Sequence, residues 1–299
     1  MAAKGLVEAL GNQAWLEPLA NTLQQAVGTA FTAAGSNGQA VKDFLHGVWL
    51  GHPLHPALTD VPVGAWTVAL ALDALEGLSG RDELGPGADA AVTLGLVGAA
   101  GAAVTGLTDW HDTDDPARRV GLVHGLLNTG AALLYTASLL SRRGGNRAAG
   151  RGYAALGYAV ATVSAYLGGE LVFQQRIGVD HAAGVQPPAD WTPVYAAPDL
   201  PSDTPRGAEV NGMQVVLVRK DTRVYALNGV CSHLGGPLAE GHVEGEGIVC
   251  PWHGSCFALD DGRVLSGPAT FPEVCLETRV RDGQIEVRAL QAPGDGSEA

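Results

Sequence analysis

Two cysteine–histidine pairs in the last third of the chain have the residue types and spacing that point most directly to chemistry. One residue separates Cys231 from His233, and two residues separate Cys250 from His253. A thiolate and an imidazole from each of two loops can hold a diiron cluster, with both sulfurs on one iron and both ring nitrogens on the other. The same four side chains can instead bind a single zinc ion. The spacing therefore predicts a metal centre of one of these two kinds.

The segments around both pairs resemble the Rieske [2Fe-2S] family. They read CSHLGG from Cys231 and CPWHGSCF from Cys250, and the stretch Gly267-Pro268-Ala269 is similar to the proline loop that covers the cluster in that family. The resemblance spans roughly residues 192–290. It favours a [2Fe-2S] cluster over zinc.

The resemblance implies roles for eight residues. The implied iron ligands are Cys231, His233, Cys250 and His253, and the residues implied to surround the cluster are Ser255, Gly236, Gly254 and Pro268. Glycines in such loops let backbone N–H groups approach the sulfides and tune the reduction potential. The hydroxyl of Ser255 stands where the family has a donor to a bridging sulfide.

Three positions depart from the high-potential branch of that family. Gly236 and Trp252 occupy the places of a disulfide that links the two loops, and Phe257 replaces a tyrosine donor. Fewer donors stabilise the reduced cluster less, so we expect a potential in the lower part of the Rieske range of about −150 to +300 mV. The two remaining cysteines, Cys256 and Cys275, are expected to pack as small apolar side chains.

Short alternating apolar stretches surround these motifs and predict strands. They cover residues 214–219, 223–227, 275–281 and 284–290, and Asn-Gly or Asp-Gly pairs separate several of them. The pattern predicts a small all-β domain.

The first part of the chain has a different composition, with long apolar runs. Residues 90–108, 120–141 and 152–169 carry no charged side chain, and a shorter run at 61–72 becomes a fourth span if Asp60, Asp73 and Glu76 lie near its ends. A membrane helix needs about 20 apolar residues. We therefore expect four transmembrane helices, with a soluble helical bundle as the alternative.

If the chain crosses the membrane four times, all the helix ends that carry histidines lie on the same side of it. A haem or metal site, or a quinone pocket, can be formed there from His52, His55, His111, His124, Glu170 and His181. Imidazole binds iron, and ionisable side chains in a membrane serve proton and electron transfer. The third interpretation is that these side chains only cap helix ends.

The segments LGHPLHPAL at residues 50–58 and GGELVF at 168–173 resemble a family of four-helix bacterial membrane domains. That likeness covers roughly residues 45–182 and implies the topology more than the chemistry. The family often has a histidine where this chain has Asp60, so ligand roles are not carried over.

The fold class expected is therefore a multidomain α + β protein, a four-helix transmembrane bundle followed by an all-β Rieske-like domain. The expected parts are an amphipathic segment at 1–45, the bundle at 46–182, a linker with the first strand at 183–205, the Rieske domain at 192–290 and a flexible tail at 291–299. A net charge of −13 argues against a nucleic-acid partner. The sequence is compatible with a homo-oligomer.

These features predict a membrane-anchored iron–sulfur protein that transfers single electrons between a quinone or haem and a cytoplasmic redox protein. The alternatives are a quinone-linked oxidoreductase with its active site in the membrane domain, and a redox sensor, so enzymatic activity stays open. No export signal is recognised and no loop-linking disulfide can form, so we expect the bacterial inner membrane, with the Rieske domain in the cytoplasm. The basic residues that flank the spans divide evenly and do not decide the orientation.

Overall fold

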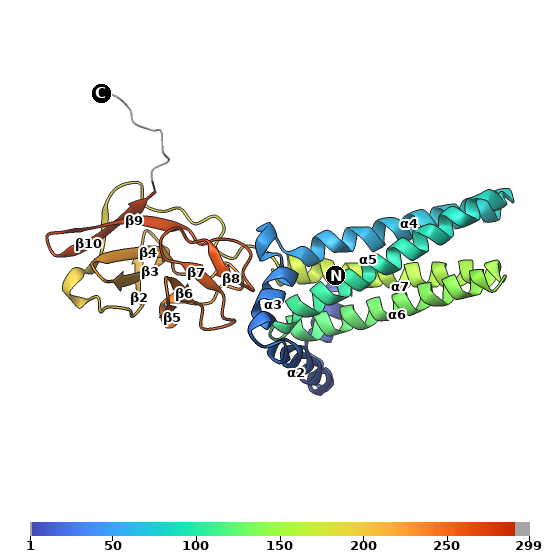
Figure 1. The fold of residues 1–299 in the computed structure, drawn as a ribbon, viewed down its shortest axis with the longest axis horizontal. Helices are drawn as coiled ribbons and strands as arrows, with labels where there is room; N and C mark the ends of the chain where they lie inside the picture. The colour runs from blue at the N-terminus through green and yellow to red at the C-terminus, as the bar shows by residue number, and fades with distance from the viewer. Residues whose placement is uncertain (1, 291–299) are drawn as a thin grey trace, which may run out of the picture. The chain divides into compact units, whose positions relative to one another are not determined.

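The computed structural model describes residues 2–290 and separates them into a helical unit and a β unit (Figure 1). The helical unit comprises the residues up to His46 together with Pro53–Ile177, and the β unit comprises Gly47–His52 and the residues from Gly178 onward. This confirms the predicted fold class. The expected tail at 291–299 lies outside the described residues.

Four long helices form the body of the helical unit. They are α4 (Leu54–Ser79), α5 (Gly85–His111), α6 (Ala117–Arg143) and α7 (Arg147–Phe173). All four are long and apolar enough to cross a membrane. The closest packing joins α4 to α5 and α6 to α7, so the unit consists of two helical hairpins.

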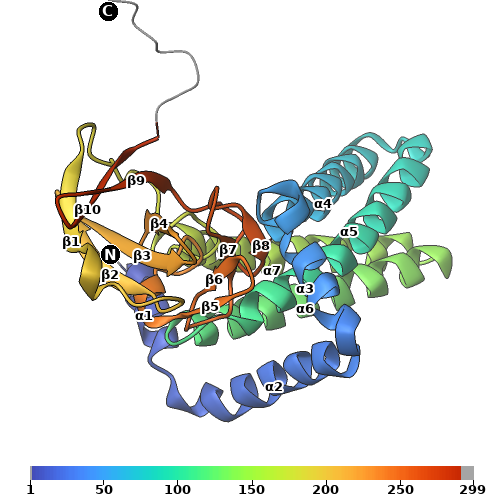
Figure 2. The same ribbon diagram turned by 60° about the vertical axis from the view of Figure 1, so that its left-hand side comes forward.

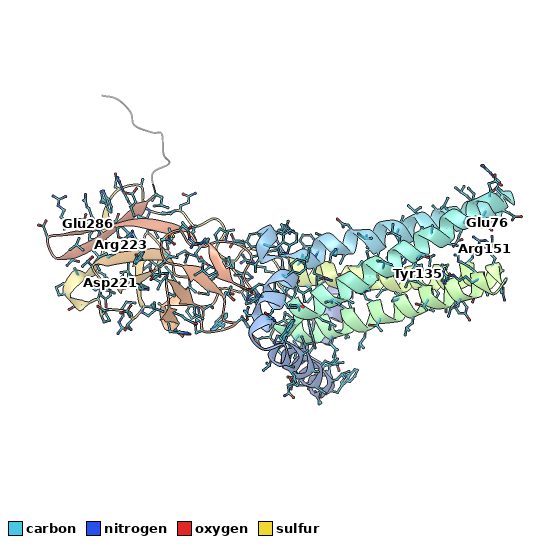
Figure 3. The ribbon with its side chains drawn as sticks, viewed as in Figure 1. Glu76, Tyr135, Arg151, Asp221, Arg223 and Glu286 are labelled. Carbon is cyan, nitrogen blue, oxygen red and sulfur yellow. The ribbon has the colours of Figure 1, made fainter. Side chains whose placement is uncertain are left out.

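Each helix extends beyond the apolar run that predicted it, because charged residues near the helix ends pair with one another. The Arg142 guanidinium is completely buried and contacts Asp73, with Nη1 2.8 Å from Oδ1. Arg147 Nε lies 2.6 Å from Glu76 Oε1. Glu76 and Arg151 mark this end of the bundle in Figure 3, and Tyr135 lies nearer its middle. Pairing allows these charges to be buried without leaving one uncompensated.

Three helices precede the bundle: α1 (Ala2–Gly11), α2 (Glu17–Ala33) and α3 (Gly38–His46). Leu16 and Ala20 are buried against Trp110 and Leu122 of the bundle, and Figure 2 shows α2 beside the long helices. Gln24 Nε2 donates to the carbonyl oxygen of Trp110 at 3.0 Å, at the end of α5. The segment expected at 1–45 thus contains helices that pack on the bundle.

The β unit contains two antiparallel sheets. The six-stranded sheet has the order β1-β10-β9-β4-β3-β2, and the four-stranded sheet has the order β5-β6-β7-β8. The strands are β1 (Thr192–Ala196), β2 (Arg206–Val210), β3 (Met213–Lys220), β4 (Arg223–Asn228), β5 (His242–Glu244), β6 (Gly247–Val249), β7 (Cys256–Ala258), β8 (Val264–Ser266), β9 (Cys275–Arg281) and β10 (Gln284–Ala289). All four stretches with an alternating pattern correspond to strands.

Strand β3 is buried on both faces. Val216 and Val218 join the core that includes Phe257 of the four-stranded sheet, while Val215 and Leu217 join a second core on the opposite face. Both faces of this strand are therefore apolar, as is usual for an interior strand. This packing holds the six-stranded sheet in place. The loop that carries Cys231 follows β4 of that sheet.

Candidate metal centre

Three loops carry the residues that the motifs single out. Cys231 and His233 lie between β4 and β5, Cys250 and His253 lie between β6 and β7, and Pro268 lies between β8 and β9. The first loop leaves the six-stranded sheet and the second belongs to the four-stranded sheet. The fold therefore brings together motifs that are distant in sequence.

The two sulfurs lie in contact inside the domain. Cys231 and Cys250 are both buried, with 1% and 3% of their surface exposed. The pKa of Cys250 falls to about 6, because the thiol of Cys231 and the backbone N–H groups of Trp252 and His253 donate to its sulfur. The hydrogen bond to Cys250 and burial raise the pKa of Cys231. Donors directed at sulfur favour thiolate, the form that binds iron.

The two imidazoles lie side by side and nearer the surface. His233 and His253 are half-buried, and their ring centroids are 5.1 Å apart in an edge-to-face arrangement. The indole of Trp252 is 55% exposed and lies next to His253, with 6.4 Å between ring centroids. The sulfur donors thus lie inside the domain and the nitrogen donors nearer its surface.

Tight turns bring the two cysteine loops together. In the first loop Cys231 N donates to Gly236 O and Gly235 N donates to Cys231 O, each at 2.8 Å. A Cβ on Gly236 would lie 2.7 Å from the sulfur of Cys250. In the second loop Gly254 has a φ of +79°, a conformation that favours glycine. Glycine at position 236 therefore lets the two loops approach.

A hydrogen bond also joins Ser255 to the loop that carries Pro268. The backbone N–H of Ala269 donates to Ser255 Oγ at 3.0 Å, and both residues are buried. Because the oxygen accepts this bond, the hydroxyl hydrogen is available to another acceptor. Pro268, which precedes Ala269, is buried and follows a cis peptide bond. Phe257 is fully buried in the core.

Glu273 is a functional candidate that the sequence did not reveal. It is 3% exposed, and its Oε1 accepts the backbone N–H of Ser232, between Cys231 and His233, at 2.6 Å. Burial raises the pKa of Glu273 to about 7, against the lowering effect of the hydrogen bonds from Ser232 and Asn228. Asn228 Nδ2 donates to Glu273 Oε2 at 3.2 Å. No spacing rule connects this glutamate to the cysteine motif.

The other two cysteines have separate environments. Cys275 belongs to the main core of the β unit, as expected for a small apolar side chain. The Cys256 sulfur lies close to Gly247, where an added Cβ would be 2.5 Å away. All four cysteines are free.

The donor set fits a diiron cluster. A [2Fe-2S] cluster with mixed ligands needs two thiolates and two imidazoles in separate pairs, and the two thiols and the two imidazoles occur here as pairs. A mononuclear zinc site needs four donors around one point. Within residues 2–290, no three His, Cys, Asp or Glu side chains are grouped as a site for one metal ion.

Comparison with known proteins agrees with this geometry. Residues 190–282 match the Rieske [2Fe-2S] domain, and ferredoxin CarAc of Metapseudomonas resinovorans is 33% identical over 98 residues, which are 32% of this chain and 92% of that protein. The chain belongs to the Rieske [2Fe-2S] family. A Rieske domain implies a [2Fe-2S] cluster, so the cluster replaces the zinc alternative.

Other Rieske proteins match the same part of the chain. The anthranilate 1,2-dioxygenase ferredoxin subunit of Burkholderia cepacia is 29% identical and covers 33% of this chain and 92% of that protein. The cytochrome b6-f complex iron-sulfur subunit of Chlorobaculum tepidum is 31% identical, with coverages of 31% and 51%. A solved ferredoxin of carbazole 1,9a-dioxygenase from Nocardioides aromaticivorans IC177 is 27% identical with a TM-score of 0.32, and covers 36% of this chain and all of that one.

The Rieske domain is preceded by a second matched domain. Residues 51–181 match a family described as predicted membrane protein (DUF2231). This match and the four apolar helices confirm the predicted membrane domain.

The six residues predicted to form a haem, metal or quinone site do not all lie together in the structure. It brings His55 and His124 together, with 6.5 Å between ring centroids. His52 and His181 belong to the β unit instead: the His52 ring lies 6.3 Å from that of Phe271, and His181 N donates to Ser232 O at 2.9 Å.

The last two candidates lie apart from that pair. His111 packs beside Gly28, where an added Cβ would be 2.9 Å from the imidazole. Glu170 accepts the hydroxyl of Tyr166 at 3.0 Å. Within the helical unit, the two histidines at 55 and 124 are thus the candidates that share a site.

Proposed function

We propose that this protein is a membrane-anchored Rieske iron–sulfur protein that passes single electrons between a redox partner in the membrane and a protein partner. The observation that carries the proposal is the pairing of buried thiols with half-exposed imidazoles in loops of a Rieske domain. A bound [2Fe-2S] cluster supplies a one-electron carrier. Four apolar helices in the same chain supply the anchor.

The proposed ligands are Cys231, Cys250, His233 and His253. The sulfurs lie inside, where N–H groups from Trp252 and His253 stabilise negative charge on Cys250. The half-buried imidazoles and the exposed indole of Trp252 form the outer edge of the site. A protein partner would therefore dock on the histidine edge.

Related proteins support partners of two kinds. The Burkholderia cepacia relative is a dioxygenase ferredoxin subunit, and a solved complex of oxygenase and ferredoxin in carbazole 1,9a-dioxygenase contains a chain 31% identical to this one. The Chlorobaculum tepidum relative is the iron–sulfur subunit of a cytochrome complex. We propose a soluble redox protein on one side of the transfer and a quinone or haem in the membrane on the other.

The proposed location is a bacterial inner membrane with the Rieske domain in the cytoplasm. Gly236 and Trp252 at the positions of the loop-linking disulfide support this, because disulfides are typical of oxidising compartments. Gly236 makes a close approach to Cys250 and Trp252 without any loop-linking disulfide. Labelling of Cys256 in intact cells and in inverted membrane vesicles tests the orientation: reaction from outside would refute it.

The central experiment uses the full chain purified in detergent under anaerobic conditions. We expect two irons and two sulfides per chain and a Rieske-type EPR signal after reduction. Cys250→Ser should abolish this signal, and Cys275→Ser, which changes a core cysteine, should keep it. Stoichiometric zinc without iron would refute the proposal. Oxidation of added quinol with an artificial acceptor, retained in Cys250→Ser, would favour an active site in the membrane domain instead.

A further inference from the structure

The two helical hairpins of the membrane unit are similar to each other. One offset of 69 residues along the chain relates positions in α4 to positions in α6. Three pairs of residues share this offset and touch: His55 with His124, Trp66 with Tyr135, and Asp73 with Arg142. The imidazole centroids are 6.5 Å apart, the aromatic rings stack with centroids 4.0 Å apart, and Arg142 Nη1 lies 2.8 Å from Asp73 Oδ1.

Equivalent positions of two repeats touch each other only where an approximate two-fold axis passes between them. All three pairs therefore lie on one axis that runs between α4 and α6, and the histidine pair is the outermost of the three at the end where α4 begins. Cofactor sites in helix bundles are formed by inward side chains of facing helices. The histidine pair has this position.

Each imidazole is held in the same way by the second helix of its hairpin. His55 Nδ1 lies 2.8 Å from the carbonyl oxygen of Ala102 on α5, and His124 Nδ1 lies 2.8 Å from the carbonyl oxygen of Ser164 on α7. One turn further along each of these helices is a glycine beside the ring. An added Cβ would lie 2.7 Å from His55 at Gly106 and 3.1 Å from His124 at Gly168.

These bonds determine which ring nitrogen carries the proton. A carbonyl oxygen only accepts, so Nδ1 donates, and a neutral imidazole then has its lone pair on Nε2. Asn128 Nδ2 lies 3.0 Å from His124 Nε2 and donates to that lone pair in this structure, so the amide must turn away when Nε2 binds a metal. Histidine ligands of metals have this arrangement, with Nδ1–H on a backbone carbonyl and Nε2 on the metal. A quinone carbonyl would need the opposite, an N–H at Nε2.

We propose that His55 and His124 bind a b-type haem in the membrane domain as its two axial ligands. The pair supplies two nitrogen donors, and the macrocycle fills the other four positions of the iron. Two imidazoles on opposite sides of one iron, each nitrogen about 2 Å from the metal, have ring centroids roughly 6 Å apart. The observed separation is 6.5 Å. The inference does not depend on the iron–sulfur cluster.

The test uses the full chain, produced in cells supplied with a haem precursor and purified in detergent. We expect one non-covalent haem per chain by the pyridine haemochrome assay. Removal of either imidazole by His55→Ala or His124→Ala should reduce haem content at least tenfold. His111→Ala is the matched control, because this histidine lies in the same unit outside the pair and should leave haem content unchanged. His124→Met should keep haem with an altered absorption spectrum, since methionine replaces one axial ligand.

The EPR signal of the cluster reports whether the β unit of each variant is folded, and far-ultraviolet circular dichroism reports the helices, so loss of haem, loss of the Rieske centre and loss of the fold are separately visible. A chain that carries the cluster but no haem would overturn the proposal. Full haem content in both alanine variants would also overturn it. Copper or zinc bound stoichiometrically by this pair, and lost in both variants, would assign the site to a bare metal ion instead.

Discussion

The packing of Gly236 against Cys250 leads to a sharp prediction about the Rieske centre. An added Cβ at position 236 would lie 2.7 Å from the Cys250 sulfur and 3.2 Å from the Trp252 ring. Non-bonded heavy atoms usually stay about 3.5 Å or more apart, so the sulfur must move by roughly 0.8 Å in Gly236→Ala. Metal-binding side chains tolerate displacements of only about 0.5 Å. Gly236→Ala should therefore lose most of its iron, while overpacking costs about 1–3 kcal/mol of stability.

Gly283→Ala, in the turn between β9 and β10, is the matched control for this prediction. An added Cβ there has no atom within 4 Å, but the φ of +76° imposes backbone strain. Such strain costs about 1–2 kcal/mol, similar to the cost of overpacking. Both variants should thus be destabilised to a similar degree, and only Gly236→Ala should lose the cluster. Iron and sulfide assays with visible circular dichroism measure occupancy, and urea unfolding measures stability. Full occupancy in Gly236→Ala would refute the steric argument.

Three further predictions concern buried charges. Because burial raises the pKa of Glu273 from 4.5 to about 7, its contribution to the stability of the domain is fully present below pH 4.5 and falls by about 3 kcal/mol as pH rises to 7; Glu273→Gln should remove this part of the pH dependence of the urea midpoint. Burial disfavours a charged His46, but its bonds to two aspartates outweigh burial and raise its pKa, so its contribution is present below pH 6.5 and lost as pH rises through the raised value. His46→Gln should remove this slope from thermal unfolding of the helical unit, and an unchanged slope would contradict the assignment. Asp73→Asn should destabilise the bundle by about 3–5 kcal/mol in detergent unfolding, whereas replacing both Asp73 and Arg142 by leucine should restore most of that loss.

The parts of the molecule with local signals could be predicted from the sequence. Apolar runs without charge indicated three of the long helices, and alternation with Asn-Gly or Asp-Gly turns indicated four strands. The short interval between Cys231 and His233 and between Cys250 and His253 indicated a metal centre, because ligands on one loop must be close in sequence.

The parts that depend on long-range packing could not be predicted. Glu273 is separated from Ser232 by 41 residues, and only the fold brings its carboxylate to the first cysteine loop. The amphipathic segment expected at 1–45 forms three α-helices, and their apolar side chains pack at different places on the bundle.

The repeat was also hidden in the sequence. At the offset of 69 residues few identities remain in the first helices, His55 with His124 and Thr67 with Thr136 among them. The third axial pair, Asp73 with Arg142, has opposite charges, so a search for identical residues passes over it. Spatial contact between equivalent positions revealed what sequence identity did not.

That pairing of opposite charges restricts how the bundle can be assembled. If two identical hairpins associated as a homodimer, each residue on the axis would face its own copy, and an aspartate would meet an aspartate inside an apolar bundle. Joining the two hairpins in one polypeptide removes this restriction, because each half can then change independently. The carboxylate of Asp73 could acquire the guanidinium of Arg142 as its counterion, while the imidazoles, which gain from facing a like residue, stayed the same in both halves. A covalent link between the halves therefore allows symmetry at the histidines and asymmetry at the charged pair within one membrane domain.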